Sequence, residues 1–114
     1  MLSIIESLAL LREAKTTSVD LIAKAKEAAQ NHAVLNAIAW VDWELAEQTA
    51  KTMDDQRRAS AGGSEIPLGP LHGIPITIKD LYQVRGTPMR AGTRAALPEL
   101  GMDEATAVNR LREA

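Results

Sequence analysis

The chain has 114 residues, of which 46% are hydrophobic and 25% are charged, and this balance excludes an intrinsically disordered protein and fits one globular domain. The formal net charge of −2 excludes a strongly basic surface, so we expect no nucleic acid among its partners. The absence of cysteine excludes disulfides, thiolate metal sites and a cysteine nucleophile.

Two helices are predicted in the first third of the chain. Apolar residues at helical spacing predict a short helix over residues 2–11. Thr17, followed three positions later by Asp20, forms a variant of the capping box. This box predicts the start of a second helix that runs to about residue 31.

A strand and a third helix are predicted next. Residues 35–41 read as a strand, although the run contains alanine, which is a weak strand former. Asp42 can cap a helix that runs to about residue 58. The buried side of this helix is predicted to carry Trp43, Ala46, Ala50 and Met53.

The second half of the chain is richer in turn residues. Small, flexible residues at 60–64 break the helical pattern, and residues 74–79 form an apolar, β-branched run that predicts another strand. A loop rich in glycine and proline follows over residues 86–101, and its length indicates a functional or interface role. A last helix is predicted from about residue 103.

The order of these elements predicts the α/β class, because helices alternate with short strands. Two or three strands are few, since sheets commonly hold about four to six, so we expect the chain to be part of something larger. The N-terminus lacks the features of a secretory signal. No apolar stretch approaches the ~18 residues that a membrane span needs. We therefore expect a cytoplasmic protein that does not bind a membrane.

Lys79 ends the second predicted strand and has two interpretations. In the first, it is a surface lysine that forms a weak ion pair with Asp80. In the second, the isoleucines of residues 74–78 cover one face of a sheet while Lys79 lies on the other. If that other face is covered too, burial lowers the proton affinity of the lysine, which can then act as a general base. Residue types and spacing do not choose between the two.

The remaining polar residues offer weaker candidates. His32 and His72 lack the spacing of metal ligands, and no acidic residues cluster around either, so neither a metal nor another cofactor is expected. His32 is predicted to end a helix, and His72 is predicted to make a structural hydrogen bond within a Pro-Leu-His-Gly turn. No serine lies in a Gly-x-Ser-x-Gly context.

Residues 69–81 read Gly-Pro-Leu-His-Gly-Ile-Pro-Ile-Thr-Ile-Lys-Asp-Leu, and this run resembles the opening motif of the amidase signature family. The Gly-Thr-Pro-Met-Arg-Ala-Gly-Thr stretch at residues 86–93 is similar to the Gly-x-Pro-Thr-Thr-Ala-Gly-Ser stretch that follows the motif in those enzymes. Upstream, residues 17–21 and 35–37 resemble the N-terminal helices and first strand of the family. The resemblance extends over essentially the whole chain.

The family hydrolyses amide bonds with a serine, a second serine in a cis peptide and a lysine, and the matching lysine here is Lys79. The resemblance implies that neutral Lys79 draws a proton from the nucleophile through the bridging serine and returns it to the leaving amine. It also implies structural support for the lysine. The supporting residues are Gly73 in the preceding turn, Pro75 at the start of the strand, Asp80 as orienter of the lysine or anchor of the next loop, and Gly92 and Thr93 in that loop.

Both serines of the family are expected beyond Ala114. The resemblance therefore implies that residues 1–114 are the N-terminal part of a single domain, truncated before the glycine- and serine-rich catalytic segment. They would hold the N-terminal helices and first strands of the mixed-sheet amidase signature fold. The expected partners are a small-molecule amide and the missing part of the same protein, with a homo-oligomer left open. Alone, the chain is expected to be inactive.

Three functions stay open on the sequence. The first is an amidase that hydrolyses a carboxamide C–N bond. The second is the glutamine-hydrolysing component of an amidotransferase, its A subunit, which releases ammonia for a partner protein; Leu81 favours the hydrolase, because asparagine is common there in that branch. The third is a non-catalytic structural or binding module, which predicts a stable, monodisperse chain with a cooperative melt.

Overall fold

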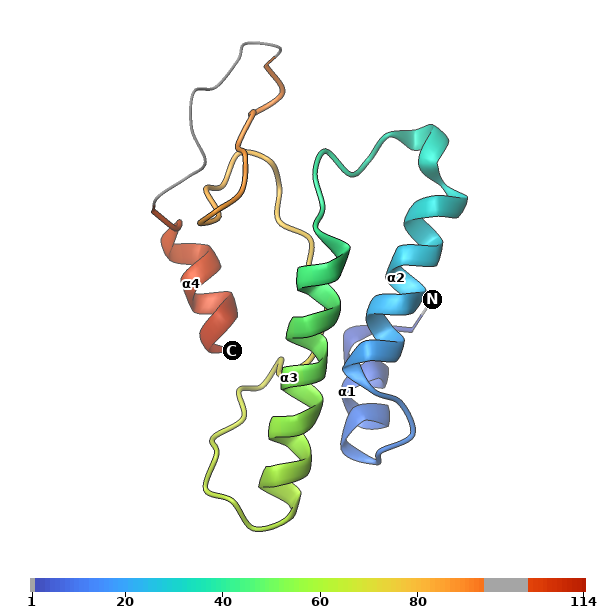
Figure 1. Cartoon of the computed structure of the whole chain (residues 1–114), viewed down its shortest axis with the longest axis vertical. Helices are drawn as coiled ribbons and strands as arrows, with labels where there is room; N and C mark the ends of the chain where they lie inside the picture. The colour runs from blue at the N-terminus through green and yellow to red at the C-terminus, as the bar shows by residue number, and fades with distance from the viewer. Residues whose placement is uncertain (1, 94–102) are drawn as a thin grey trace. The chain divides into compact units, whose positions relative to one another are not determined.

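A computed structural model of the chain describes residues 2–93 and 103–114 (Figure 1). The chain divides into two compact units, Met1–Pro75 and Ile76–Ala114. Residues 94–101 of the predicted long loop lie outside the described residues. The first unit contains α1 (Ile4–Arg12), α2 (Ser18–Asn31) and α3 (Trp43–Ala61), and the second contains α4 (Thr106–Glu113).

The two N-terminal helices begin at reciprocal capping boxes, and both predicted helices are confirmed. At α1, Ser3 Oγ accepts a hydrogen bond from Glu6 N at 3.2 Å, and Glu6 Oε2 accepts one from Ser3 N at 2.7 Å. At α2, Thr17 Oγ1 accepts from Asp20 N at 3.0 Å, and Asp20 Oδ2 accepts from Thr17 N at 2.9 Å. The side-chain hydrogen bond with Thr17, followed by the backbone one, lowers the pKa of Asp20 below its ordinary value.

The third helix begins at Asp42, as predicted, because Asp42 Oδ1 accepts a hydrogen bond from Leu45 N at 2.9 Å. It ends at Ala61, with Gly62 as the C-cap, slightly later than the sequence predicted. On its predicted inner side, Ala50 is buried and the other three residues are half-buried. The periodicity of the sequence therefore identified the packing face of α3.

Helices α2 and α3 pack against each other as an antiparallel pair (Figure 1). Ser18, at the start of α2, contacts Asp54 in the second half of α3. Further along α2, Lys26 Nζ donates to Glu47 Oε1 at 2.8 Å. From the first contact to the second, the position rises along α2 and falls along α3, so the two helices form a helical hairpin. The Lys26 hydrogen bond also lowers the pKa of Glu47.

The hydrophobic interior is small. Among the described residues, the buried hydrophobic side chains are Leu11, Leu21 and Ala50 in the first unit and Val108 in the second. Large apolar side chains such as Ile5, at 80% exposed, and Val34, at 93%, lie outside it. The small interior follows from an apolar composition that is rich in alanine, because alanine buries little area.

The predicted strand over residues 35–41 is wrong for this structure. Leu35 ends the short 3₁₀ helix η1 (Ala33–Leu35), and Asn36 turns the chain with φ of 48°. Residues 37–41 are exposed and irregular. A strand needs a hydrogen-bonded neighbour for its amides and carbonyls, and the described part of the chain supplies no such neighbour.

The predicted strand over residues 74–79 is also wrong, for the same physical reason. These residues leave a turn at 70–73 and reach another at 80–82 without strand pairing. Their isoleucines do not pack on a sheet, and Ile76 is 44% exposed. The α/β prediction is therefore corrected: residues 2–93 and 103–114 form helices, turns and irregular segments without a strand.

In the second unit, α4 begins after Ala105, a few residues later than predicted and without a side-chain cap. Val108 is the buried hydrophobic residue of this helix, whereas Ala107 and Leu111 are exposed. Glu104 accepts hydrogen bonds from Arg112 Nε with both carboxylate oxygens at 3.0 Å. The N–H of Ala105 donates to Gln83 O at 2.9 Å, so the start of α4 is fixed to the segment that follows Lys79.

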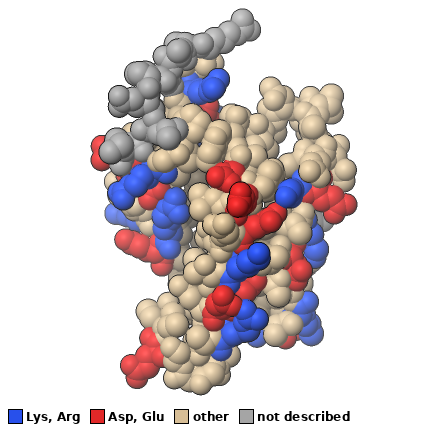
Figure 2. All heavy atoms as spheres, in the orientation of Figure 1, with Lys and Arg blue, Asp and Glu red and all other residues tan. Residues whose placement is uncertain are grey.

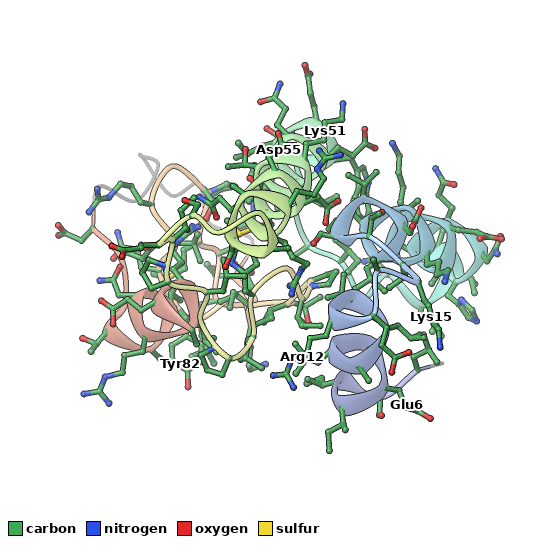
Figure 3. The ribbon with its side chains drawn as sticks, turned by 90° about the horizontal axis from the view of Figure 1, so that it is seen from below. Glu6, Arg12, Lys15, Lys51, Asp55 and Tyr82 are labelled. Atoms are coloured by element: carbon green, nitrogen blue, oxygen red, sulfur yellow. The ribbon has the colours of Figure 1, made fainter. Side chains whose placement is uncertain are left out.

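Charged side chains of both signs are intermixed on the face seen in Figure 2. Lys51 and Asp55 on α3 extend away from the ribbon (Figure 3) and are exposed. Within residues 2–93 and 103–114, none of the helices combines the length and apolarity that crossing a membrane requires.

Candidate active site

Lys79, the predicted base, follows an irregular segment and begins a turn. Its carbonyl oxygen accepts hydrogen bonds from Leu81 N at 2.7 Å and Tyr82 N at 3.0 Å. Its side chain is exposed and forms no ion pair with any residue that the structure describes. The structure thus places Lys79 at the surface, as in the first interpretation, but without the ion pair to Asp80.

Asp80 holds the loop that follows the lysine. Its Oδ1 accepts a hydrogen bond from Arg90 N at 2.9 Å, and its carbonyl oxygen accepts one from Ala91 N at 2.8 Å. These two contacts close residues 80–91 into one loop. Of the two roles considered for Asp80, the geometry favours anchoring this loop over orienting the lysine.

Gly92 and Thr93 form a turn at the end of the same loop. Gly92 has φ of 74°, in the left-handed region that favours glycine. The N–H of Thr93 donates to Arg90 O at 2.8 Å. Both residues therefore directly follow Arg90 and Ala91, the two residues that Asp80 binds. They are distant from Lys79 in the sequence.

Gly73 and Pro75 lie in the first unit, on the segment that leads toward the lysine. Gly73 has φ of 83°, and a Cβ built on it would lie 2.3 Å from Ser18 Oγ. No side chain other than hydrogen fits this position without moving a neighbour. Pro75 is half-buried and is the last residue of the unit.

His72 makes the structural hydrogen bond that the sequence predicted. Its Nε2 lies 2.9 Å from the carbonyl oxygen of Met53, in α3. His32 also takes its predicted place at a helix end, where its Nδ1 lies 2.9 Å from Ala28 O. Both imidazoles therefore bind backbone carbonyls.

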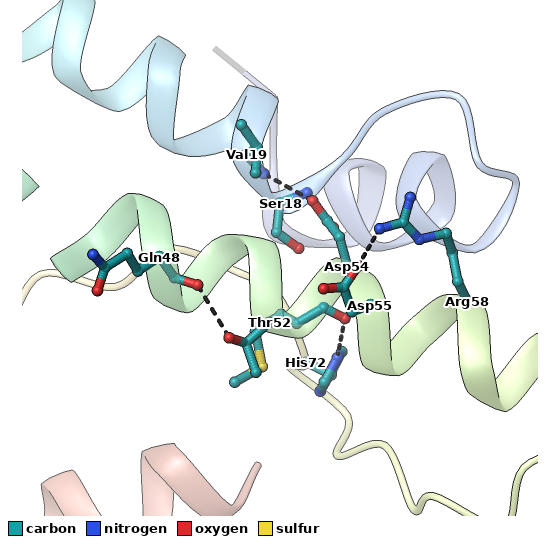
Figure 4. A network of polar contacts seen from close by, with 9 residues as sticks. Ser18, Val19, Gln48, Thr52, Asp54, Asp55, Arg58 and His72 are labelled. Carbon is teal, nitrogen blue, oxygen red and sulfur yellow. Dashed lines mark hydrogen bonds and ion pairs between the residues drawn. The ribbon is translucent and has the colours of Figure 1, made fainter. Parts of the chain in front are cut away.

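The sequence did not reveal a set of contacts that we call the α3 polar cluster, formed by Asp54, Arg57 and the carbonyl oxygen of Met53. Asp54 Oδ1 accepts from Ser18 N at 2.7 Å, and Oδ2 accepts from Val19 N at 3.2 Å (Figure 4). Arg57 Nη2 donates to the carbonyl oxygen of His72 at 2.5 Å. These partners are separated from the cluster by 15 to 36 positions, so no local sequence signal could have indicated them.

The structure gives no positive indication of a metal site. Within the described ranges, no three side chains among histidine, aspartate and glutamate come close enough to hold an ion. One shallow hollow lies in the second unit, lined by Arg85, Glu104, Asn109 and Arg112. It does not include Lys79 or Asp80, and its carboxylate is already bound by Arg112.

Comparison with known proteins gives consistent matches. The Amidase family model matches residues 20–114. The chain is 38% identical over 118 residues to 2-amino-5-chloromuconic acid deaminase of Comamonas testosteroni, covering 97% of this chain and 23% of that protein. It is 38% identical over 106 residues to the glutamyl-tRNA(Gln) amidotransferase A subunit of Bordetella avium, covering 93% of this chain and 20% of that protein.

Two further matches extend the same pattern. An acylamidase of Rhodococcus erythropolis is 38% identical over 80 residues, covering 70% of this chain and 16% of that protein. A crystal structure of an amidase superposes with a TM-score of 0.86 at 42% identity, covering 99% of this chain and 25% of that chain. The chain thus spans between 16% and 25% of the length of these proteins.

Proposed function

The chain belongs to the amidase family, and from this premise we propose that residues 1–114 are the part of a single amidase domain that supplies the catalytic lysine, Lys79. The observation that carries the proposal is the match to the solved amidase, which extends over 99% of this chain at 42% identity. Because this chain corresponds to only 25% of the solved one, the nucleophilic and bridging serines are proposed to come from further polypeptide.

The proposed reaction is hydrolysis of a carboxamide C–N bond. The neutral amine of Lys79 accepts a proton through the bridging serine while the nucleophilic hydroxyl adds to the amide carbonyl. The proton then passes to the leaving nitrogen as the C–N bond breaks, which leaves an acyl-enzyme and a free amine or ammonia. Water attacks the acyl-enzyme by the same route and releases the carboxylic acid, so the serine and the lysine are restored.

The exposed irregular segments support the idea that further polypeptide completes the site. Ile38 and Trp40 are 41% and 47% exposed, and Ile76 is 44% exposed. All three lie in runs whose sequences favour strands but whose backbone is not paired. Strands from the rest of an amidase domain would pair with these runs. The same cover would surround Lys79 with protein, which favours the neutral form that a base requires.

The second candidate is the glutamine-hydrolysing component of an amidotransferase. It is favoured by the match to the A subunit of the glutamyl-tRNA(Gln) amidotransferase, which covers 93% of this chain. The proposed lysine chemistry is the same in both candidates, because both break a carboxamide C–N bond. The difference lies in the amide that is bound, and Leu81 after the Lys79-Asp80 pair favours the hydrolase.

The test uses a hybrid amidase, defined as the solved amidase in which the segment that matches this chain is replaced by residues 1–114. We expect the hybrid to release ammonia from a simple carboxamide. Lys79→Ala should lower kcat by about 10²–10⁴-fold, because the reaction loses its base. The matched control is Lys51→Ala, which removes an exposed lysine of α3 and should leave kcat unchanged.

The outcomes separate the candidates. A folded hybrid in which Lys79→Ala keeps near-parental kcat contradicts the role of Lys79. Ammonia release from glutamine but not from simple carboxamides favours the amidotransferase. A hybrid that melts cooperatively and hydrolyses neither amide favours the non-catalytic module and contradicts the proposed function.

A further inference from the structure

A single turn of α3 holds the start of α2. The first four N–H groups of a helix have no partner within the helix. The carboxylate of Asp54 accepts from two of them, Ser18 N at 2.7 Å and Val19 N at 3.2 Å, while Thr17 Oγ1 accepts from a third, Asp20 N. A negative charge at this end also interacts favourably with the helix dipole. The carboxylate of Asp54 therefore fixes α2 relative to α3 by binding the backbone of α2.

The same turn holds residues 69–75, the segment that leads toward the lysine. Arg57 Nη2 donates to the carbonyl oxygen of His72, and Met53 O lies 2.9 Å from His72 Nε2. A carbonyl oxygen can only accept, so this hydrogen bond is donated by an N–H at Nε2 of His72. His72 is thus bound to α3 through both its backbone and its ring.

Gly73 shows how closely this segment approaches α2. A Cβ at this position would lie 2.3 Å from Ser18 Oγ and 3.4 Å from Arg57 Nη2. Ser18 is 1% exposed, and its Oγ has no hydrogen-bond partner among the residues that the structure describes. The Ser18 side chain therefore contributes close contact with the glycine rather than a hydrogen bond.

From these contacts we propose that Asp54, Arg57 and His72 are positioning residues for the amide hydrolysis proposed above. Arg57 and His72 hold residues 69–75 against α3, and Asp54 holds the start of α2 against the same helix. Three residues separate residues 69–75 from Lys79 in the chain. A shift of about 1 Å in a reacting group can cost on the order of 10²-fold in rate. Because the backbone is continuous from Pro75 to Lys79, a displacement of this segment changes the range of positions open to the lysine. The inference rests on the proposed function, and the α3 polar cluster is its structural basis.

The first test measures hydrogen exchange on the 114-residue chain and needs no activity. The amides of His72 and Ile74 donate to Gly69 O and Leu71 O within the turn. Arg57→Gln should raise the exchange rate of these two amides about tenfold, because the turn loses the donor that fixes it. The amides of α3 should keep their protection. Equal loss of protection in α3 would mean that the unit unfolds as a whole, and it would overturn the positioning role.

The second test measures kinetics in the hybrid amidase. His72→Leu removes the donor to Met53 O and should lower kcat by about 10–100-fold with KM little changed. His72→Gln places an amide N–H where Nε2 stands and should restore most of kcat, which an acid–base role of the ring would not allow. The matched control is His32→Leu, which removes an imidazole bound to a helix-end carbonyl at the same 2.9 Å distance and should leave kcat unchanged.

The failures of the two ideas are distinguishable. If the parental hybrid does not hydrolyse amides, the proposed function fails before any positioning variant is compared. If the parental hybrid is active and folded His72→Leu and Arg57→Gln variants keep its kcat, the positioning role is overturned. The same holds if kcat falls only in proportion to the folded fraction seen by circular dichroism, because the residues would then be structural.

Discussion

The two units of the chain are organised by different kinds of contact. In Met1–Pro75, charged side chains bind backbone groups far away in sequence, as Asp54 binds Ser18 across 36 positions. In Ile76–Ala114, Asp80 reaches Arg90 across ten positions, and Glu104 reaches Arg112 across eight. The side-chain hydrogen bonds of the first unit thus join separate helices. Those of the second unit span fewer positions, and a backbone hydrogen bond from Ala105 N to Gln83 O joins α4 to the segment after Lys79. The first unit is therefore stabilised by its own contacts, whereas Lys79 is exposed and would need further protein around it to be buried.

The largest expected effect compares a buried leucine of the first unit with an exposed leucine of the second. Leu11 is 1% exposed, so Leu11→Ala should destabilise the chain by about 2–5 kcal/mol. Leu81 in the second unit is 48% exposed, and Leu81→Ala should cost less than about 1 kcal/mol. Urea unfolding of both variants followed by circular dichroism measures the difference. Equal losses would contradict the burial of Leu11 and the exposure of Leu81.

A pair of glycines sharpens the same comparison. Gly73 and Gly92 both have positive φ, but a Cβ at Gly73 meets Ser18 Oγ, whereas a Cβ at Gly92 meets no described atom within 4 Å. Gly92→Ala should cost about 1 kcal/mol for backbone strain alone, and Gly73→Ala should cost more. Thermal unfolding of the two variants compares them. Adding Ser18→Ala should recover the excess cost of Gly73→Ala, and no recovery would contradict the close contact.

The capping box at α2 makes the first unit sensitive to acid. The pKa of Asp20 is lowered by its hydrogen bonds to Thr17. Its stabilising contribution is therefore present above the ordinary pKa of the carboxyl group and is lost as pH falls through the lowered value in the folded chain. Thr17→Ala should cost about 1 kcal/mol at neutral pH and should flatten this acid dependence. Unfolding free energies measured from neutral pH to about pH 3 test it; an unchanged slope would contradict the role of the box.

The smallest expected effect concerns the loop held by Asp80. Asp80→Ala removes the acceptor for Arg90 N, so the exchange of that amide should accelerate while the helices keep their protection. The cost should be about 1 kcal/mol and local to the loop. Hydrogen exchange followed by NMR gives both readouts. Loss of protection in α2 or α3 would contradict the view that this loop is organised locally.

Several features of the fold were predictable from short stretches of sequence. Thr17 with Asp20 and Asp42 marked two helix starts, because a cap bonds an amide only three positions away. The spacing of apolar residues likewise identified the inner face of α3, on which Ala50 is buried. The hydrogen-bonding role of His72 was also predictable, although its partner in α3 was not.

Other predictions failed or could not be made, for one physical reason. The strand pattern of residues 35–41 and 74–79 depends on partner strands, and the described residues provide none, so both runs are irregular. Asp54 and Arg57 could not be identified as contacts, because their partners are brought near only when α2 folds back on α3. Propensity and spacing report on neighbours in sequence and do not encode such pairings.

By itself, the sequence determined the starts of α2 and α3, the helical face around Ala50 and the family motif that ends at Lys79 and Asp80. Only the tertiary structure decided that this motif is held at His72 and Gly73 by the α3 polar cluster, and that Lys79 is exposed. Caps and periodicity act over three or four residues, whereas burial and long-range hydrogen bonds depend on which segments meet in space.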